Sequence, residues 1–576
     1  MQRRRVWRTC AVAAAAAAGG GYVYDRTVQA SAVWRTLRTF GDIAVICADY
    51  KINFRSSLDP TALERVHQRA ARRLLHRCQA NGGLFIKFGQ SIAVQSALLP
   101  SAFRSELQEL YDSAPSSGLA QMQPVIERSL GRPLPAVFAE FSPEAVASAS
   151  VAQVHRARLH GDPPDVWVAV KVQKPEIKRQ IGWDLFALRT CARMVERAFG
   201  IPLMWSVGEV ERRLREELDF LREAHNSERA ARDLDTLADG WLRRAVHVPP
   251  VRWSATAREV LTTEWVDGVS LVDPGKVAAA GWRASDVMRR VVALFAFQVF
   301  VSGNVHGDPH PGNILVRPTP GRAREPQVVL LDHGLYVRES TEFRRQFAEF
   351  WRAAALADRP GMARIALAWG MPDAEAFAAM MTLRPTALVR ELDHQRDQEK
   401  LPKPGSYTRH MEVKQRAVAA LRDARGLPPE LVFVVRNANI VRAHNQRMGI
   451  PVNRTLILGQ YAALGLRRLL VHEAWDPDAQ RYSREEGVVV VGGGRGGEWV
   501  RRLCAVVRAE WRYATFCLAV GLAATLAALN SVWVRAVERV TGRSVGGDGV
   551  AAMDEAVRRA VEAKLGYSID ASLFSA

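Results

Sequence analysis

Apolar and polar residues recur with helical spacing over residues 55–140, where Arg, Leu and Ala repeat through RVHQRAARRLLHRCQANGG and LFIKFGQSIAVQSALLP. This periodicity predicts a helical region. The pattern changes at about residue 141. Residues 166–172 alternate in polarity and are rich in β-branched side chains, which is typical of a strand, and strand-like runs also lie within 251–266 and 326–332.

Between these strands, the apolar spacing of residues 207–230 predicts one long amphipathic helix. Residues 287–301 predict an apolar helix that ends at a Ser-Gly pair, and the pattern from about 338 to 475 is helical. Residues 483–499 are rich in Gly and predict a linker, and the chain has no internal repeat. The pattern as a whole predicts an α+β fold, in which a small sheet-containing lobe precedes a larger helical one.

Both ends of the chain carry segments that suggest targeting or membrane contact. Within residues 1–30, four Arg and no acid precede Asp25, and an Ala run follows the basic start. This is typical of a mitochondrial address, with a secretory signal as the alternative. Residues 513–534 hold 22 residues without a charge, which is long enough to span a bilayer. Because small and polar residues dilute this run, a buried C-terminal helix is the alternative to a transmembrane one.

Composition limits the class of protein. The 576 residues suffice for roughly three to four domains. An apolar share of 48% with 24% charged residues is ordinary for a globular protein, which excludes a wholly disordered chain and a polytopic membrane protein. The six Cys are scattered without a CxxC pair, so they form neither a disulfide framework nor a zinc site. The net charge of +19 favours an anionic partner, although an Arg-rich compositional bias produces the same surplus.

Two pieces of a phosphate-binding site come first along the chain. Residues 168–171 read VAVK, a strand that ends in Lys171, the position whose Lys holds the α- and β-phosphates in protein kinases. Glu217 borders the apolar stripe of the predicted 207–230 helix and is the predicted partner of Lys171. Glu223 lies nearly opposite that stripe and is predicted to be a poorer partner. Taken alone, the first piece more often marks a solvated strand Lys, and the second more often marks a charged helix edge.

Two further pieces follow. Residues 306–313 read HGDPHPGN, in which Asp308 and Asn313 have the spacing of a kinase catalytic loop, where the Asp orients the nucleophile and the Asn binds Mg²⁺. Residues 328–334 read VVLLDHG, so a strand delivers Asp332 in the place of the Mg²⁺-binding Asp of D-F-G. Oxygen ligands of this kind suit Mg²⁺ better than Zn²⁺. The order of all four pieces makes the set specific where each part is weak.

The sequence also departs from an ordinary protein kinase. No Gly occurs between Arg132 and His160, and the Ala-rich segment 147–155 stands where a Gly-rich loop is expected. Because Ala carries a Cβ, this turn cannot approach phosphate backbone-first as Gly does, so nucleotide geometry and selectivity should differ. No A-P-E segment follows Asp332.

A G-x-G-x-x-G match at residues 492–497 is rejected as a dinucleotide site. Only 79 residues follow it, and no second strand or ribose-binding acid is placed for a βαβ unit. The basic charge is dispersed and no aromatic platform interleaves it, so we expect no nucleic-acid partner.

Together these residues resemble the UbiB family of atypical kinases, also called ABC1, aarF or ADCK, over about residues 60–475. Residues 87–90 match the family's K-x-G-Q motif, Glu217 and Asp219 its E-x-D motif, and segment 147–155 its Ala-rich loop. The phrases ELDFL, WVDG, VHGDPHPGN and VLLDHGLY are similar to the mitochondrial aarF-domain-containing kinase 1 branch.

The resemblance implies a protein-kinase-like bilobal fold, with a helical extension at 55–140, a kinase-like domain at 141–475 and a helical C-terminal region at 500–576. It also implies ATP and Mg²⁺ as cofactors. Carried over by motif, the implied roles are catalytic for Asp308, Lys171 and Glu217, nucleotide-binding for Ala147, Ala149, Ser150, Gln153 and Lys171, Mg²⁺-binding for Asn313 and Asp332, and gating for Lys87, Gln90 and Asp219.

Lys87 and Gln90 are three residues apart on one helical face, so both can point into one cleft. In the family such residues obstruct protein substrates, so the resemblance implies an atypical kinase or ATPase rather than a conventional protein kinase. It further implies action at a mitochondrial membrane, most simply the inner one, in lipid or quinone homeostasis. The implied partners are a nucleotide, a membrane lipid or isoprenoid-quinone precursor, and membrane proteins. The alternative is a non-catalytic nucleotide-binding scaffold for membrane or lipid-handling partners.

Overall fold

The computed structural model describes the greater part of the chain, with gaps. The described residues are 23–26, 31–55, 59–94, 100–111, 116–200, 203–237, 240–356, 358–371, 381, 428–449, 452–475 and 503–518. They divide into two compact units. The described residues of the first lie within 1–227 and 249–266, and those of the second within 228–248, 267–400 and 424–576. Each unit is described by itself.

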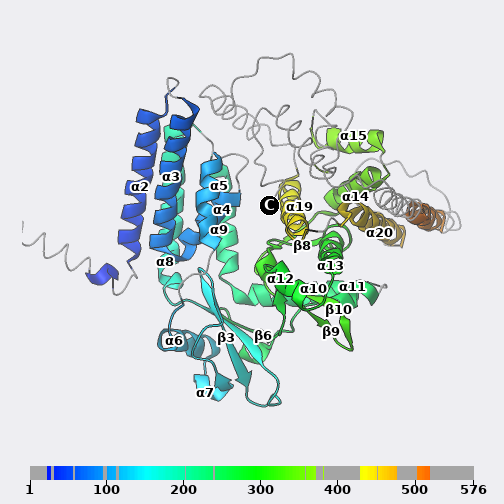
Figure 1. Cartoon of the computed structure of the whole chain (residues 1–576), viewed down its shortest axis with the longest axis horizontal. Coiled ribbons are helices and arrows are strands. Elements are labelled where there is room, and N and C mark those ends of the chain that lie inside the picture. The colour runs from blue at the N-terminus through cyan, green and yellow to red at the C-terminus, as the bar shows by residue number, and fades with distance from the viewer. Residues whose placement is uncertain are drawn as a thin grey trace, which may run out of the picture. The chain divides into compact units, whose positions relative to one another are not determined.

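The first unit opens with a group of helices that lie side by side (Figure 1). They are α2 (Ala32–Asn53), α3 (Pro60–Asn81), α4 (Gly83–Val94), α5 (Ser101–Leu107) and α8 (Ile177–Phe199). The start of α3 is well specified, because Asp59 accepts a hydrogen bond from the Ala62 N–H and Pro60 occupies the first turn. The helical pattern predicted for 55–140 is confirmed within the described residues, and α2 adds a helix before it that the sequence analysis did not predict.

A buried ion pair joins α2 to α8. The Arg35 guanidinium lies 3.2 Å from the Asp184 carboxylate, whose side chain is 0% exposed. Burial raises the pKa of Asp184 to about 6, although Arg35 opposes this shift. Arg35 Nε and Nη1 and Asp184 Oδ1 are buried without a hydrogen-bond partner within the described residues. Each charge therefore depends on the other for compensation.

The sheet of the first unit is antiparallel, in the order β1-β3-β4-β6, with β2 paired to β3. Its strands are β1 (Phe138–Phe141), β2 (Ala147–Ser148), β3 (Ala152–Leu159), β4 (Val168–Gln173) and β6 (Val260–Glu264). Val168, Val170 and Val172 of β4 are fully buried in one apolar cluster with residues of α6 (Leu119–Leu130). Since side chains alternate along a strand, Lys171 belongs to the opposite face. The strand predicted at 166–172 is thus confirmed.

The second unit is mainly helical around a small sheet in the order β5-β10-β9-β7, with a separate β8–β11 pair. Its strands are β5 (Val246–His247), β7 (Val269–Ser270), β8 (Asn304–His306), β9 (Ile314–Thr319), β10 (Arg322–Leu330) and β11 (Tyr336–Arg338). Its helices include α11 (Gly240–Ala245), α12 (Pro274–Ala279), α13 (Ala284–Phe297), α14 (Thr341–Ala355), α15 (Arg359–Ala368), α19 (Pro429–Arg447) and α20 (Arg454–Trp475).

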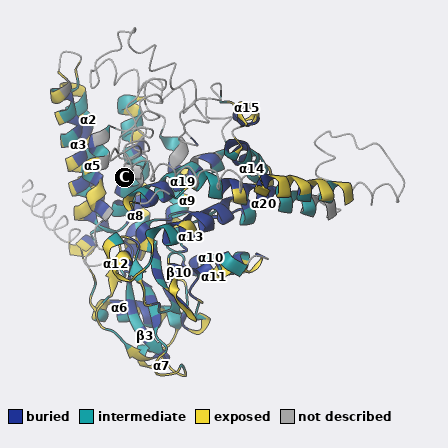
Figure 2. Ribbon diagram, turned by 45° about the vertical axis from the view of Figure 1, so that its right-hand side comes forward, coloured by how far each residue is buried: buried dark blue, intermediate teal, exposed yellow. Residues whose placement is uncertain are grey.

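Helix α13 forms the centre of this unit and is buried along most of its length (Figure 2). The apolar helix predicted at 287–301 is confirmed, but its last turn, Gln298–Ser302, is π-helical. Gly303 ends it with φ +66°, a left-handed conformation that favours Gly. Helix α20 packs against this turn so closely that a Cβ at Gly465 would lie 2.1 Å from the Phe300 carbonyl oxygen.

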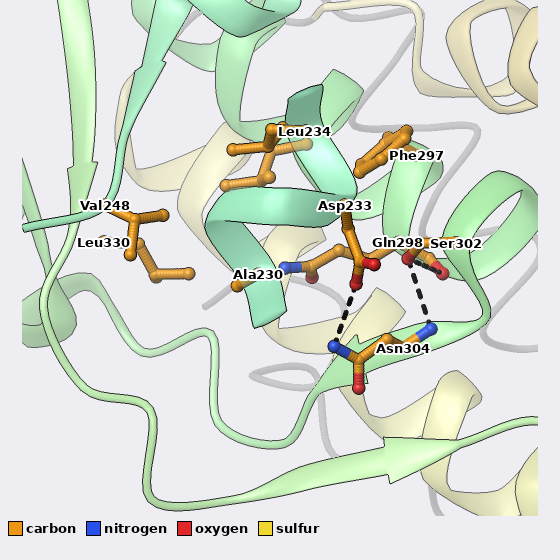
Figure 3. Close-up of a pocket in the computed structure, with 10 residues that line it drawn as sticks. Ala230, Asp233, Leu234, Val248, Phe297, Gln298, Ser302, Asn304 and Leu330 are labelled. Carbon is orange, nitrogen blue, oxygen red and sulfur yellow. Dashed lines mark hydrogen bonds between the residues drawn. The ribbon is translucent and has the colours of Figure 1, made fainter. Parts of the chain in front are cut away.

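A polar network at the end of the π-helical turn fixes the start of β8 (Figure 3). The Asn304 side-chain amide donates to Asp233 Oδ2 at 3.1 Å, and the Asn304 N–H donates to Ser302 Oγ at 3.2 Å. These residues border a cavity of about 10 Å³, which is about the space that one water molecule needs. Because β8 leads into residues 307–313, this network positions the loop that carries Asp308.

Several expectations fall outside the described residues. Residues 1–22, 483–499 and 519–534 are not described, so the targeting segment, the linker and most of the candidate span stay predictions. Among the helices that the structure does describe, none is long and apolar enough to cross a membrane.

Removing one partner of the buried pair should destabilise the protein. We expect Arg35→Met to lower the free energy of unfolding by about 3–5 kcal/mol, because it leaves the Asp184 charge buried without compensation. Denaturant unfolding measures this loss. The double variant Arg35→Met/Asp184→Leu should recover most of it, and a single variant as stable as the parent would contradict the interpretation.

Gly465→Ala should also destabilise the protein, although Ala is the better helix former by about 1 kcal/mol. The added Cβ would collide with the Phe300 backbone, so α20 must shift away from the π-helical turn. Thermal unfolding should show a midpoint several degrees lower. Gly208→Ala is the matched control, because a Cβ there meets nothing within 4 Å and should leave the midpoint equal or higher.

Candidate functional site

Lys171 on β4 forms an ion pair with Glu223. Its ammonium donates to Glu223 Oε1 at 2.7 Å and to Oε2 at 2.8 Å. The Glu223 side chain is 3% exposed, whereas that of Lys171 is 25% exposed. The ammonium also lies 5.2 Å from the centre of the Phe220 ring. The predicted pairing of Lys171 with Glu217 is therefore wrong, and the carboxylate judged the poorer partner is the one that holds the Lys.

The error arises from the helix predicted at 207–230, which is two helices. Helix α9 (Met204–Glu217) ends at Leu218, and α10 (Phe220–Asp235) begins after Asp219, whose side chain accepts from the Leu221 N–H at 3.2 Å. The break changes the helical phase, so a single apolar stripe does not extend across it. Asp219 acts as an N-cap, and an Asp directly before an apolar residue is the signal that could have revealed the break.

Glu217 contacts the K-x-G-Q helix instead. Its carboxylate lies 3.4 Å from the Lys87 ammonium on α4, and both side chains are partly exposed. Gln90, on the same helix, donates to the Leu110 carbonyl at 2.8 Å. The position between them, Gly89, favours Gly for a steric reason: a Cβ there would lie 2.2 Å from Leu110 Cδ1. The motif thus combines a charged contact to α9 with close packing against residue 110.

The Ala-rich segment is the β2–β3 hairpin turn, closed by the Ala149 N–H donating to the Ala152 carbonyl at 2.8 Å. Ala147 and Ala149 are exposed, and Ser150 is buried. Lys174, a residue that the sequence analysis did not single out, is buried and donates to the Ala149 carbonyl at 2.8 Å. Burial lowers the pKa of Lys174. This Lys holds the turn against the end of β4.

Gln153 does not face the open side of the hairpin. Gln153 is buried, with 1% of the residue exposed. Its side-chain amide donates to the Ser117 carbonyl and accepts from the Ser117 N–H, both at 2.8 Å. Its amide nitrogen also lies 2.8 Å from His155 Nε2. The nucleotide contact of Gln153 stays a prediction; in the structure the amide braces the chain at Ser117.

The loop that carries Asp308 lies in the second unit and is held by its own side chains. Asn313 donates to the Asp308 carbonyl at 3.2 Å, and His310 Nδ1 accepts from the Gly312 N–H at 3.2 Å. Gly307 allows a close approach, since a Cβ there would lie 2.3 Å from Leu335 Cγ. The Asp308 carboxylate is half-exposed, with the Arg436 guanidinium 3.9 Å away. The Asn313 side chain and the Asp308 backbone are thus held within one short turn.

His306 connects this loop to Asp332. Its Nδ1 accepts from the Asp308 N–H at 3.0 Å, so Nε2 carries the proton and donates to the Asp332 carbonyl. Helix α19 supports the same loop, because Asn437 donates to the His306 carbonyl at 2.7 Å and His444 Nε2 to that of Pro309 at 2.9 Å. Burial lowers the pKa of His444 to about 4, so this donor is neutral at pH 7.

Asp332 ends β10 and is oriented by its own turn. Its Oδ1 accepts from the Gly334 N–H at 2.9 Å. His333 is buried, stacks on Tyr336 and accepts from the Tyr336 hydroxyl at 2.9 Å, while its Nε2 donates to the Leu330 carbonyl. The middle residue of Asp-His-Gly is therefore structural. It keeps Asp332 at the surface of the turn.

The oxygen donors of Asp308, Asn313 and Asp332 fit a hard divalent cation such as Mg²⁺. Among the described residues, no group of three or more His, Cys, Asp or Glu is placed to hold a metal ion. A Mg²⁺ ion in phosphoryl transfer needs no such cluster, because one or two protein ligands combine with the phosphates of the substrate.

The comparisons with known proteins identify the family of the chain. The model of the ABC1 atypical kinase-like domain matches residues 109–366. An ABC1 family protein of Schizosaccharomyces pombe is 37% identical over 80% of this chain and 84% of its own length. The ABC1 family protein lscO of Purpureocillium lilacinum is 38% identical over 78% and 80%.

AarF domain-containing protein kinase 1 of Mus musculus is 31% identical over 82% of this chain and 88% of its own length. A solved structure, Rv3197 with erythromycin from Mycobacterium tuberculosis, covers 64% of this chain and 89% of its own at 20% identity and a TM-score of 0.43, a likeness too distant to support an argument. The family and the α+β, kinase-like fold expected from the motifs are thereby confirmed. The chain belongs to the ABC1, or AarF domain-containing, family of atypical kinases.

Proposed function

We propose that this protein is a Mg²⁺-ATP-dependent atypical kinase or ATPase that acts at a mitochondrial membrane in lipid or quinone homeostasis. The observation that carries the proposal is the Lys171–Glu223 pair, because phosphoryl transfer needs a phosphate-binding Lys that is held in place. Glu223 is buried and fixes the ammonium at two oxygens. The Lys171 side chain is partly exposed, and in the proposal its ammonium binds the α- and β-phosphates.

The proposal also assigns roles to residues of the second unit. In the proposal, Asp332 and Asn313 bind Mg²⁺, which would neutralise charge on the phosphates. Asp308 orients the attacking oxygen, from water or from a lipid-like hydroxyl, and accepts its proton. The hydrogen bonds of His306 and Asn313 support this role, because they fix the backbone of the loop before any ligand binds.

Access to Lys171 is the proposed task of the K-x-G-Q helix. The Lys87–Glu217 contact is a partly exposed pair, and such pairs are worth about 0–1 kcal/mol. A contact this weak can open and close at little cost. Gly89 keeps α4 close to residue 110, so Lys87 would move without displacing the helix. In the proposal Asp219 also supports this gating contact, because it caps α10 two residues after Glu217, the partner of Lys87.

The membrane setting is supported by charge and composition. The net charge of +19 suits an anionic surface, and residues 513–534 are free of charged side chains. The acceptor is then a membrane lipid or an isoprenoid-quinone precursor. A conventional protein kinase is disfavoured by the Ala-rich turn, whose carbonyl at Ala149 is bound by Lys174.

Glu223→Gln should lower ATP turnover at least about tenfold, because Lys171 loses the charge that holds it. Steady-state ATP hydrolysis by the full chain measures this effect. Glu216→Gln is the matched control, since Glu216 pairs with the surface residues Arg212 and Arg222 and its substitution should leave turnover unchanged. A larger loss in Glu217→Gln than in Glu223→Gln would favour the original sequence-based pairing.

Asp332→Asn should abolish ATP turnover while the fold is retained, because the Mg²⁺-binding charge is lost. Turnover is measured with and without anionic vesicles and a phenolic quinone-precursor mimic, with nucleotide binding followed in parallel. Asp235→Asn, at an exposed surface pair, is the control. If the parent protein binds Mg²⁺-nucleotide tightly but never turns it over, the enzyme proposal fails and the nucleotide-binding scaffold stands.

A further inference from the structure

A polar cleft lies in the second unit and is lined by residues of α11, α13 and the β9–β10 hairpin. Figure 1 labels these elements. The volume of the cleft is about 310 Å³. The residues that line it are Trp241, Arg244, Ala245, Asp286, Arg289, Arg290, Thr319, Arg322, Arg324, Glu325 and Pro326. None of them was singled out by the sequence analysis.

The charge of this cleft is strongly positive. Five Arg stand against two acidic residues, Asp286 and Glu325, which leaves a surplus of three positive charges. Glu325 pairs with Arg322 at 3.1 Å. Arg289 and Arg324 are exposed and reach the cleft from two different elements, α13 and β10. Separate elements thus bring like charges together, which is unfavourable unless an anion accompanies them.

Arg290 is the buried member of the group, at 7% exposure. Its Nη1 donates to the backbone carbonyl of Asp286 at 2.9 Å, and its guanidinium lies 5.7 Å from the centre of the Trp241 ring. Its Nε is buried without a hydrogen-bond partner within the described residues. A buried guanidinium that lacks a carboxylate partner at hydrogen-bond distance gains from an anion beside it.

The cleft is separate from the proposed phosphoryl-transfer site. Strand β9 starts at Ile314, directly after Asn313, and ends at Thr319 in the cleft. A strand rises about 3.4 Å per residue, so the five steps from Ile314 to Thr319 place the cleft about 17 Å from the Mg²⁺-binding loop.

We propose that this cleft binds a phosphate-bearing anion, either a dissolved phosphate ester or the head group of an anionic lipid. Guanidinium forks match phosphate oxygens in geometry and stay charged when partly desolvated. The volume equals that of the smaller ligand pockets, which span about 300–1,000 Å³, but the charged lining selects a polar anion rather than an apolar ligand. This inference does not depend on the proposed ATP-dependent activity.

The test compares the full chain with Arg289→Gln/Arg324→Gln, which removes two exposed charges and leaves the buried Arg290 in place. One arm measures pyrophosphate binding by calorimetry. The other measures co-sedimentation with phosphatidylcholine vesicles that contain or lack phosphatidic acid. We expect binding in at least one arm to weaken about tenfold or more, and the arm that responds identifies a dissolved or a lipid source.

Arg359→Gln/Arg364→Gln is the matched control, because it removes the same charge from exposed positions on α15. Equal weakening in both double variants would show non-specific attraction to the net charge and overturn the proposal. Absence of binding in both arms would also overturn it. ATP turnover measured alongside keeps this result distinct from the proposed function, because neither double variant alters a residue assigned to nucleotide or Mg²⁺.

Discussion

The pairing of Lys171 with the buried Glu223 is the constraint on which the first unit depends. A carboxylate at 3% exposure needs a compensating cation, and the ammonium of Lys171 is that cation. The pair forms only if α10 starts at the right residue. Two contacts ensure this: the Phe220 N–H donates to the Arg258 carbonyl, just before β6, and Gln173 at the end of β4 donates to the Leu218 carbonyl. The sheet therefore determines where the helix breaks, and the break determines which carboxylate meets Lys171.

In the second unit a neutral imidazole has the comparable role. His306 accepts from one segment and donates to the other, so the Asp308 loop and the Asp332 turn share one residue. Helix α19 then binds the carbonyls of His306 and Pro309. Each unit thus fixes its polar residues through hydrogen bonds among its own elements before a ligand is considered, which is the preorganisation that phosphoryl transfer rewards.

The arginines show why composition describes this protein poorly. Arg35 is buried against Asp184, whereas Arg289 and Arg324 are exposed beside a cleft. All three add equally to the net charge of +19, yet the first acts on stability and the others concentrate positive potential at one place. Only their surroundings distinguish them.

The sequence by itself determined the family, the alternation of β4, the apolar helix before the loop, and the close spacing of Asp308 and Asn313. These features are local, because each depends on residues that lie close together along the chain. Tertiary structure decided that Glu223 rather than Glu217 meets Lys171, that Gln153 turns toward Ser117, and that five arginines from separate elements share one cleft. Such contacts depend on helix phase and on segments far apart in sequence. A helix break at Leu218 and Asp219 was enough to exchange the roles of two carboxylates.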